Sequence, residues 1–97
     1  MSGGVSPDDA LLGADVGRFR LTQLIGRGGM GRVYLGVHPT IGSRVAIKVL
    51  AAEYAESPEL HERFFTEARA VNFIHEHIVA ITDLDRLPSG RPYIVME

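Results

Sequence analysis

One lysine stands among nine arginines in this chain of 97 residues. Lys48 lies inside an apolar run, VAIKVL, at residues 45–50. Its neighbours alternate like those of a strand, with Val45, Ile47 and Val49 on the opposite face. Lysine is a compact charge on a slim stem, whereas arginine is a broad planar fork. The exception therefore predicts a site where a compact cation meets an anion.

Four glycines fall within GRGGMG at residues 26–31. A dinucleotide-binding loop of the G-x-G-x-x-G type would open a helix, but residues 32–37 alternate like a strand. A Walker A loop needs lysine and a hydroxyl residue after its last glycine, where this chain has Arg32 and Val33. Two interpretations stay open on the cluster alone. One is a hairpin whose glycine-rich tip approaches phosphates, and the other is a plain hairpin turn.

A carboxylate falls within an apolar helical stripe. Ser57 and Pro58 predict the start of a helix that runs to about Ile74. Glu67 lies in the middle of its stripe, and an unpaired buried charge costs on the order of 3–5 kcal/mol, which predicts a cation partner such as Lys48. Alternatively, Glu67 lies at an exposed part of the stripe and pairs with Arg63 or solvent. The stripe consists of Leu60, Phe64, Val71 and Ile74.

The surrounding pattern predicts the elements that position these residues. Strands are expected at residues 19–25, 33–37, 45–50, 78–87 and 92–97. Turns are expected at residues 38–43 and 88–90, which contain glycine and proline. Residues 1–16 hold Gly, Ser, Pro and Asp and are predicted to form a flexible leader.

Composition excludes several classes of protein. The apolar fraction of 45% and charged fraction of 23% are ordinary for one small globular domain. A net charge of -2 gives no reason to expect nucleic acid. No apolar run approaches the ~18 residues of a membrane helix, and the chain has neither a signal peptide nor cysteine, which favours the cytoplasm.

Two further pairs of polar residues are not predicted to form a functional site. His75 and His77 lack a nearby third ligand, so no metal site is predicted. Asp83 and Asp85 are expected on a solvated strand face.

The ordered set of motifs resembles the N-terminal lobe of a protein kinase, of the bacterial Ser/Thr type that resembles eukaryotic kinases. GRGGMGRVY at 26–34 is similar to the family's glycine-rich loop, and VAIK at 45–48 matches its strand motif. FFTEA at 64–68 resembles the helix segment that carries the pairing glutamate. HEHIV at 75–79 is similar to the family's H-P-N-I-V turn, and YIVME at 93–97 resembles the last strand and the start of the hinge.

The resemblance implies an α+β small lobe at residues 17–97, with a five-stranded antiparallel sheet and one αC-type helix. It implies an ATP-binding lobe of a kinase that transfers the γ-phosphate to protein Ser/Thr hydroxyls. Lys48 and Glu67 would be catalytic, with Lys48 binding the α- and β-phosphates and pairing with Glu67. Val33 and Ala46 would wall the adenine pocket, Met96 would be the gatekeeper, and the Glu97 carbonyl would face the adenine amino group. The full implied nucleotide set is Ile25, Gly26, Arg27, Gly28, Gly29, Met30, Gly31, Val33, Ala46, Lys48, Met96 and Glu97.

The family's H-R-D, D-F-G and A-P-E segments do not occur in these residues. The resemblance therefore implies that the Mg²⁺ ligands and the contacts to a protein substrate come from the absent second lobe. These 97 residues are expected to be inactive alone. The alternatives are a pseudokinase-like or truncated binding module, or the same lobe in a small-molecule kinase.

Overall fold

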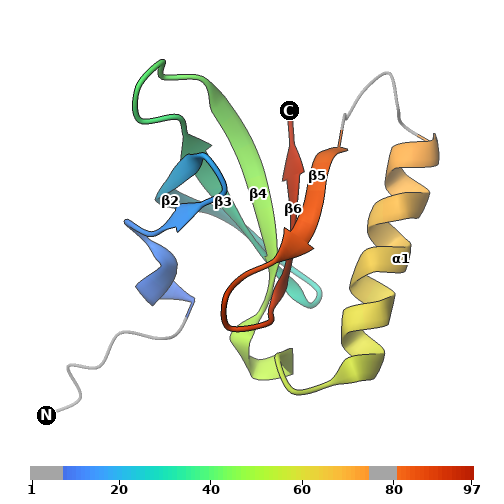
Figure 1. The fold of residues 1–97 in the computed structure, drawn as a ribbon. Coiled ribbons are helices and arrows are strands. Elements are labelled where there is room, and N and C mark those ends of the chain that lie inside the picture. Colours follow the sequence, from blue (N-terminus) through green and yellow to red (C-terminus); the bar gives the residue numbers. More distant parts are fainter. Residues whose placement is uncertain (1–7, 75–80) are drawn as a thin grey trace, which may run out of the picture.

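The chain folds as an antiparallel sheet with a long helix packed on one face (Figure 1). The structure is a computed structural model that describes residues 8–74 and 81–97, with no description of the side chains of residues 71–74. The strands follow the spatial order β1-β2-β3-β4-β6-β5. They are β1 (Asp15–Val16), β2 (Phe19–Gly28), β3 (Gly31–Val37), β4 (Arg44–Leu50), β5 (Ile81–Arg86) and β6 (Pro92–Met96).

The sheet of the described residues has six strands, not the five that were expected. The additional strand is β1, whose Asp15 and Val16 pair with Arg20 and Phe19 of β2. A 3-10 helix, η1 (Asp9–Leu11), precedes it. Residues 8–16 are thus part of the fold, although the sequence predicts a leader up to residue 16. Val16 is only 2% exposed, so apolar burial holds this segment against the sheet.

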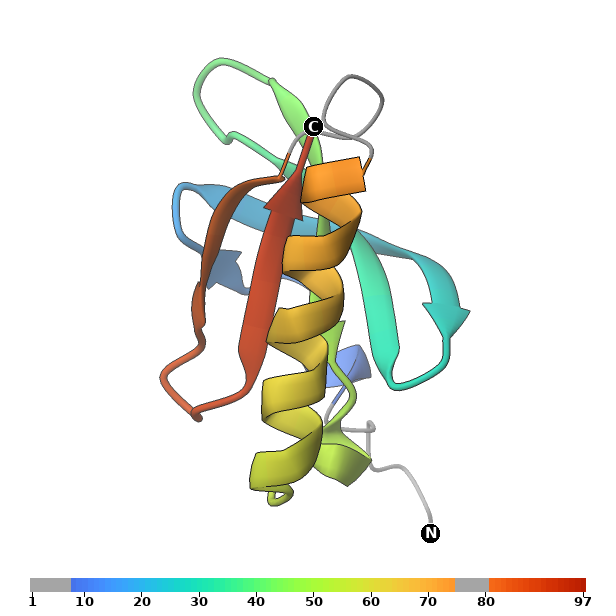
Figure 2. The same cartoon turned by 90° about the vertical axis from the view of Figure 1, so that its right-hand side faces the viewer.

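The long helix, α1 (Pro58–Ile74), begins where the sequence predicts. The Ser57 hydroxyl accepts a hydrogen bond from the Leu60 backbone N–H at 3.3 Å, which satisfies one free donor of the first turn. A short 3-10 helix, η2 (Ala52–Tyr54), connects β4 to this start. Figure 2 shows α1 running along β6.

The sheet has an apolar cluster on each face. β4 alternates between them, since Val45, Ile47 and Val49 lie in the cluster away from α1 and Leu50 lies in the other. The cluster away from the helix contains Val16, Leu21, Tyr34, Val45, Ile47, Val49, Leu87, Tyr93 and Val95. The helix-side cluster contains Leu50, Phe64, Phe65, Ala68 and Ile94.

Candidate functional site

Lys48 lies on the helix side of β4, because strand residues two apart share a face and Leu50 packs against α1. On the neighbouring strand, Val33 is its partner in register. Gly31 is the next residue of β3 on that face. A Cβ placed on Gly31 would lie 2.5 Å from Cε and 3.2 Å from Cγ of Lys48. The lysine stem therefore packs directly over the Gly31 backbone, and a Cβ at this position would require the lysine side chain to shift.

The glycine-rich segment forms the tip of the β2–β3 hairpin. Gly28 pairs with Gly31, so Gly29 and Met30 make the turn. Gly29 has φ +53, in the left-handed region that favours glycine. The hairpin predicted from the spacing is confirmed, and β2 extends three residues further into the cluster than expected. A Cβ on Gly28 would meet nothing within 4 Å, so packing inside the chain does not require glycine there.

Two cavities meet at Lys48 and Glu67, which line both of them. The first, of about 460 Å³, lies against the glycine turn and is lined by Gly28, Gly29, Met30, Lys48, Tyr54, Leu60, Arg63 and Glu67. The second, of about 500 Å³, is mostly apolar and is lined by Val33, Lys48, Phe64, Glu67, Ala68, Ala70, Ile94 and Met96. The two cavities thus share Lys48 and Glu67, and one is lined by the glycine turn and charged side chains whereas the other is mostly apolar.

Glu67 is exposed. The sheet-facing side of α1 is occupied instead by Phe64, Phe65 and Ala68, with Glu67 at the edge of this group. The expectation of a buried carboxylate is therefore wrong, and the alternative of an exposed position on the stripe holds. Among the ion pairs of the described residues, none joins Glu67 to Lys48 or to Arg63. Lys48 and Glu67 face the same cavities, and their pairing stays a prediction.

Six of the implied nucleotide-site residues line these two cavities together with Glu67: Gly28, Gly29, Met30, Val33, Lys48 and Met96. The structure does not place the others on them. Ile25 is 50% exposed on β2, and Ala46 pairs with Met96 across β4 and β6. The remaining residues of that group are Gly26, Arg27, Gly31 and Glu97.

Arg63, Tyr54 and Leu60 line the cavity at the glycine turn, although the sequence did not predict them as site residues. Arg63 lies one helical turn before Glu67, so the spacing of four residues was a usable signal. Tyr54 belongs to η2, and no local pattern points to its position.

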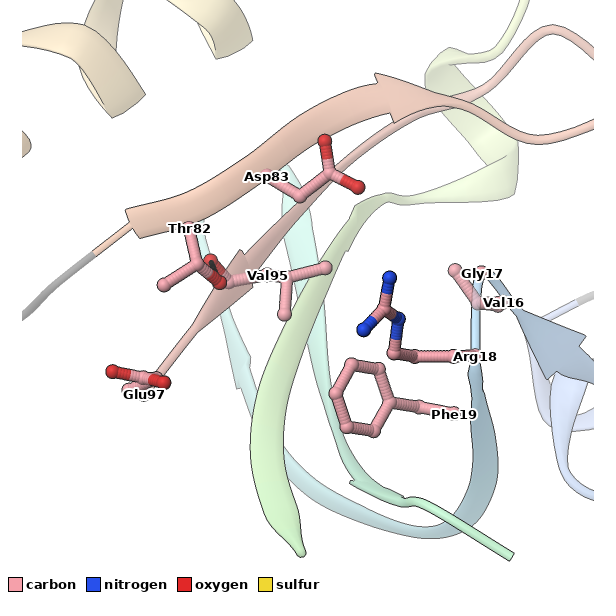
Figure 3. A pocket seen from close by; sticks show the side chains of 8 residues that line it. All are labelled: Val16, Gly17, Arg18, Phe19, Thr82, Asp83, Val95 and Glu97. Carbon is pink, nitrogen blue, oxygen red and sulfur yellow. Dashed lines mark hydrogen bonds between the residues drawn. The ribbon is translucent and has the colours of Figure 1, made fainter.

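A separate cavity of about 640 Å³ lies elsewhere, lined by Val16, Gly17, Arg18, Phe19, Thr82, Asp83, Val95 and Glu97. Figure 3 shows Arg18 and Phe19 on one side of it and Thr82 and Asp83 on the other. Glu97, which directly follows β6, lines this cavity rather than the one beside Met96. The backbone carbonyl of Glu97, which the family resemblance singles out, is a different group from its side chain.

Residues 8–74 and 81–97 contain no group of three His, Asp or Glu side chains placed to hold a metal ion. His75 and His77 lie outside the described residues. Asp83 and Asp85 are exposed on β5, as expected for a solvated strand face. No helix in the described part is long and apolar enough to cross a membrane.

The fold is that of the small lobe of a protein kinase. The kinase domain of Mycobacterium tuberculosis PknI superposes with a TM-score of 0.62 at 29% sequence identity. This superposition covers 89% of the chain but 34% of the PknI chain. A PknI kinase domain carrying two substitutions gives a TM-score of 0.63. No protein-family model matches the chain.

At the level of sequence, the chain is homologous to bacterial serine/threonine protein kinases. It is 57% identical to serine/threonine-protein kinase Pkn1 of Myxococcus xanthus over 94 residues, which is 96% of this chain and 13% of Pkn1. It is 43% identical to PknA of Mycobacterium tuberculosis over 86 residues, covering 84% of this chain and 20% of PknA. The chain therefore spans a small part of the kinases it matches.

Proposed function

We propose that this chain is the ATP-binding lobe of a serine/threonine protein kinase. One observation carries the proposal: Lys48 lies where the cavity at the glycine turn meets the apolar cavity beside Val33 and Met96. A nucleotide has a matching division, because its charged phosphates lie at one end and its flat, largely apolar base lies at the other. The turn residues would cover the phosphates, and the apolar cavity would take the base.

The residues present fit the phosphates in two respects. Lys48 supplies a compact cation on a stem held over Gly31. The open space above Gly28 allows a ligand to approach the backbone N–H groups of the turn. Glu67, facing the same cavities, would orient Lys48 when the two side chains pair.

Phosphoryl transfer is proposed for the complete kinase and not for these residues alone. The chain covers 34% of the PknI chain on which it superposes. Kinases of this family transfer the γ-phosphoryl group of Mg²⁺-bound ATP and release ADP. We expect the metal ligands and the protein substrate's contacts to come from the rest of the kinase domain. Transfer of phosphate to a Ser/Thr peptide by the 97-residue chain would contradict this part of the proposal.

The test compares ATP and adenosine binding by isothermal titration calorimetry. Lys48→Met should weaken ATP binding by about 10- to 150-fold, because a hydrogen bond to a charged group contributes roughly 1.5–3 kcal/mol. Adenosine binding should stay within about twofold, since it has no phosphate. Arg44→Met is the matched control, because it removes an exposed cation from the same strand.

Equal ATP affinity of the unmodified and Lys48→Met chains would refute the assignment. A chain that binds neither ATP nor adenosine would favour the alternative of a pseudokinase-like or truncated binding module.

A further inference from the structure

The carboxylate of Asp8 joins segments that are far apart in sequence. Its Oδ1 accepts hydrogen bonds from Arg91 Nη1 at 2.6 Å and from the Ala52 backbone N–H at 3.1 Å. Its Oδ2 lies 3.9 Å from Nε of Arg32. The Asp8 backbone carbonyl accepts a hydrogen bond from the Tyr34 hydroxyl at 2.7 Å. One residue thus connects the N-terminal segment to β3, to η2 and to the β5–β6 turn.

This junction is largely shielded from solvent. The side chains of Asp8, Arg32 and Arg91 are 17%, 16% and 7% exposed. Ion pairs that are shielded in this way are screened by salt less than surface pairs. Burial raises the pKa of Tyr34 to about 12, and the neighbouring Asp8 charge acts in the same direction. The contacts of Asp8 are therefore partly buried hydrogen bonds and ion pairs, not exposed surface contacts.

The junction continues directly to the glycine turn. Asp8 accepts a hydrogen bond from the Ala52 N–H. The neighbouring Ala51 N–H donates a hydrogen bond to the Met30 carbonyl at 2.7 Å. Arg32 donates to the Gly31 carbonyl at 3.0 Å and to Glu53 at 3.4 Å. The start of η2 has no capping side chain of its own, so the Asp8 carboxylate supplies the acceptor there.

We propose that Asp8 is a positioning residue for the glycine turn: it fixes the β4–α1 connection and Arg32, which hold Met30 and Gly31. The N-terminal segment thereby becomes part of the nucleotide site without touching a ligand. This inference rests on the proposed function as far as ATP is concerned. The effect on the turn itself does not depend on that function.

The test uses the 97-residue chain with Asp8→Ala. Asp15→Ala is the matched control, because it removes an aspartate of the same segment whose ion pair with Arg20 is exposed. Amide hydrogen exchange should become about tenfold faster at Ala51 and Ala52 in the Asp8 variant. Exchange at Val49, in the buried part of β4, should change less than twofold. Asp8→Asn keeps a neutral hydrogen-bond acceptor, so exchange at Ala51 and Ala52 should increase by an intermediate amount. This variant replaces Asp8→Ala in the test if Asp8→Ala does not fold.

Binding distinguishes positioning from a general loss of stability. The ATP-to-adenosine affinity ratio should fall about three- to tenfold in Asp8→Ala and stay unchanged in Asp15→Ala. Unchanged exchange at Ala51 and Ala52 would overturn the inference, as would faster exchange with an unchanged ratio. If the unmodified chain binds no ATP, the proposed function fails, and exchange at Ala51 and Ala52 alone decides whether Asp8 holds the turn.

Discussion

Replacing Gly31 by alanine should displace the Lys48 side chain while the sheet remains folded. The added Cβ would lie 2.5 Å from Lys48 Cε, which is closer than real Cβ contacts, and 3.2 Å from Cγ, which is a tight contact. Gly31 is not among the glycines with positive φ, so alanine can adopt its backbone conformation. The conflict is therefore confined to the contact with the lysine stem.

The expected change in stability is small because two effects oppose each other. Moving the lysine to a less favourable rotamer costs about 0.5–1.5 kcal/mol. Replacing glycine by alanine at a compatible position stabilises by about 0.4–1 kcal/mol, because the unfolded chain has fewer conformations. The free energy of unfolding should therefore change by less than about 1 kcal/mol. The loss of ATP affinity should approach that of removing the charged contact, about 1.5–3 kcal/mol.

The single lysine makes this displacement directly measurable. Labelling with ¹³C-lysine gives NMR signals from one side chain, Lys48, and Gly31→Ala should shift its Cε signal. In a double-mutant cycle with Lys48→Ala, the ATP-binding effect of Gly31→Ala should largely disappear. Gly26→Ala is the control for the lysine signal alone, because its Cβ would meet Val33 at an ordinary 3.7 Å and not Lys48. An unshifted lysine signal, or additive effects on ATP binding, would refute the reasoning.

Two further predictions concern stability. Ser57→Ala removes the hydroxyl that accepts the Leu60 N–H hydrogen bond at the start of α1. The free energy of unfolding, measured with urea, should fall by about 1 kcal/mol, whereas Glu59→Ala in the same turn should change it less. Burial raises the pKa of Tyr34 from 10.0 to about 12, so the folded state binds this proton more tightly than the unfolded state. Stability from this group should be fully present below about pH 10 and fall by up to about 3 kcal/mol as pH rises to about 12. Tyr34→Phe should flatten that decline, and equal slopes in both chains would count against it.

Elements that depend on local chemistry were predictable from the sequence. The alternation in residues 45–50 predicted a strand and its two faces, and β4 has Ile47 and Val49 in one apolar cluster and Leu50 in the other. Ser57 and Pro58 predicted the start of α1 within one residue. Both predictions were confirmed because strand alternation and helix capping depend on residues that are only a few positions apart.

Features that depend on distant partners were not predictable. Asp8 belongs to a polar segment, and its meeting with Arg91 spans 83 residues of sequence, so no local pattern distinguished it from a leader residue. Glu67 illustrates a second limit. Periodicity gives the angle of a side chain around the helix axis but not how far the sheet extends beneath it. Phe65 and Ala68 take the contact with the sheet, and Glu67 remains at its edge.

The lone lysine has a structural reason as well as a proposed functional one. Its stem lies over Gly31, where a slim chain packs against the bare backbone, and it lines the cavity beside Val33 and Phe64. An arginine in that place would put a planar guanidinium where the lysine has a single ammonium group. Two non-local contacts adjoin the proposed site: the packing of the Lys48 stem over the Gly31 backbone, and the hydrogen bonds by which Asp8 holds Ala52 next to Ala51, which donates to Met30. The proposed role of Lys48 thus involves residues outside its own motif, one 17 positions and the other 40 positions earlier in the chain.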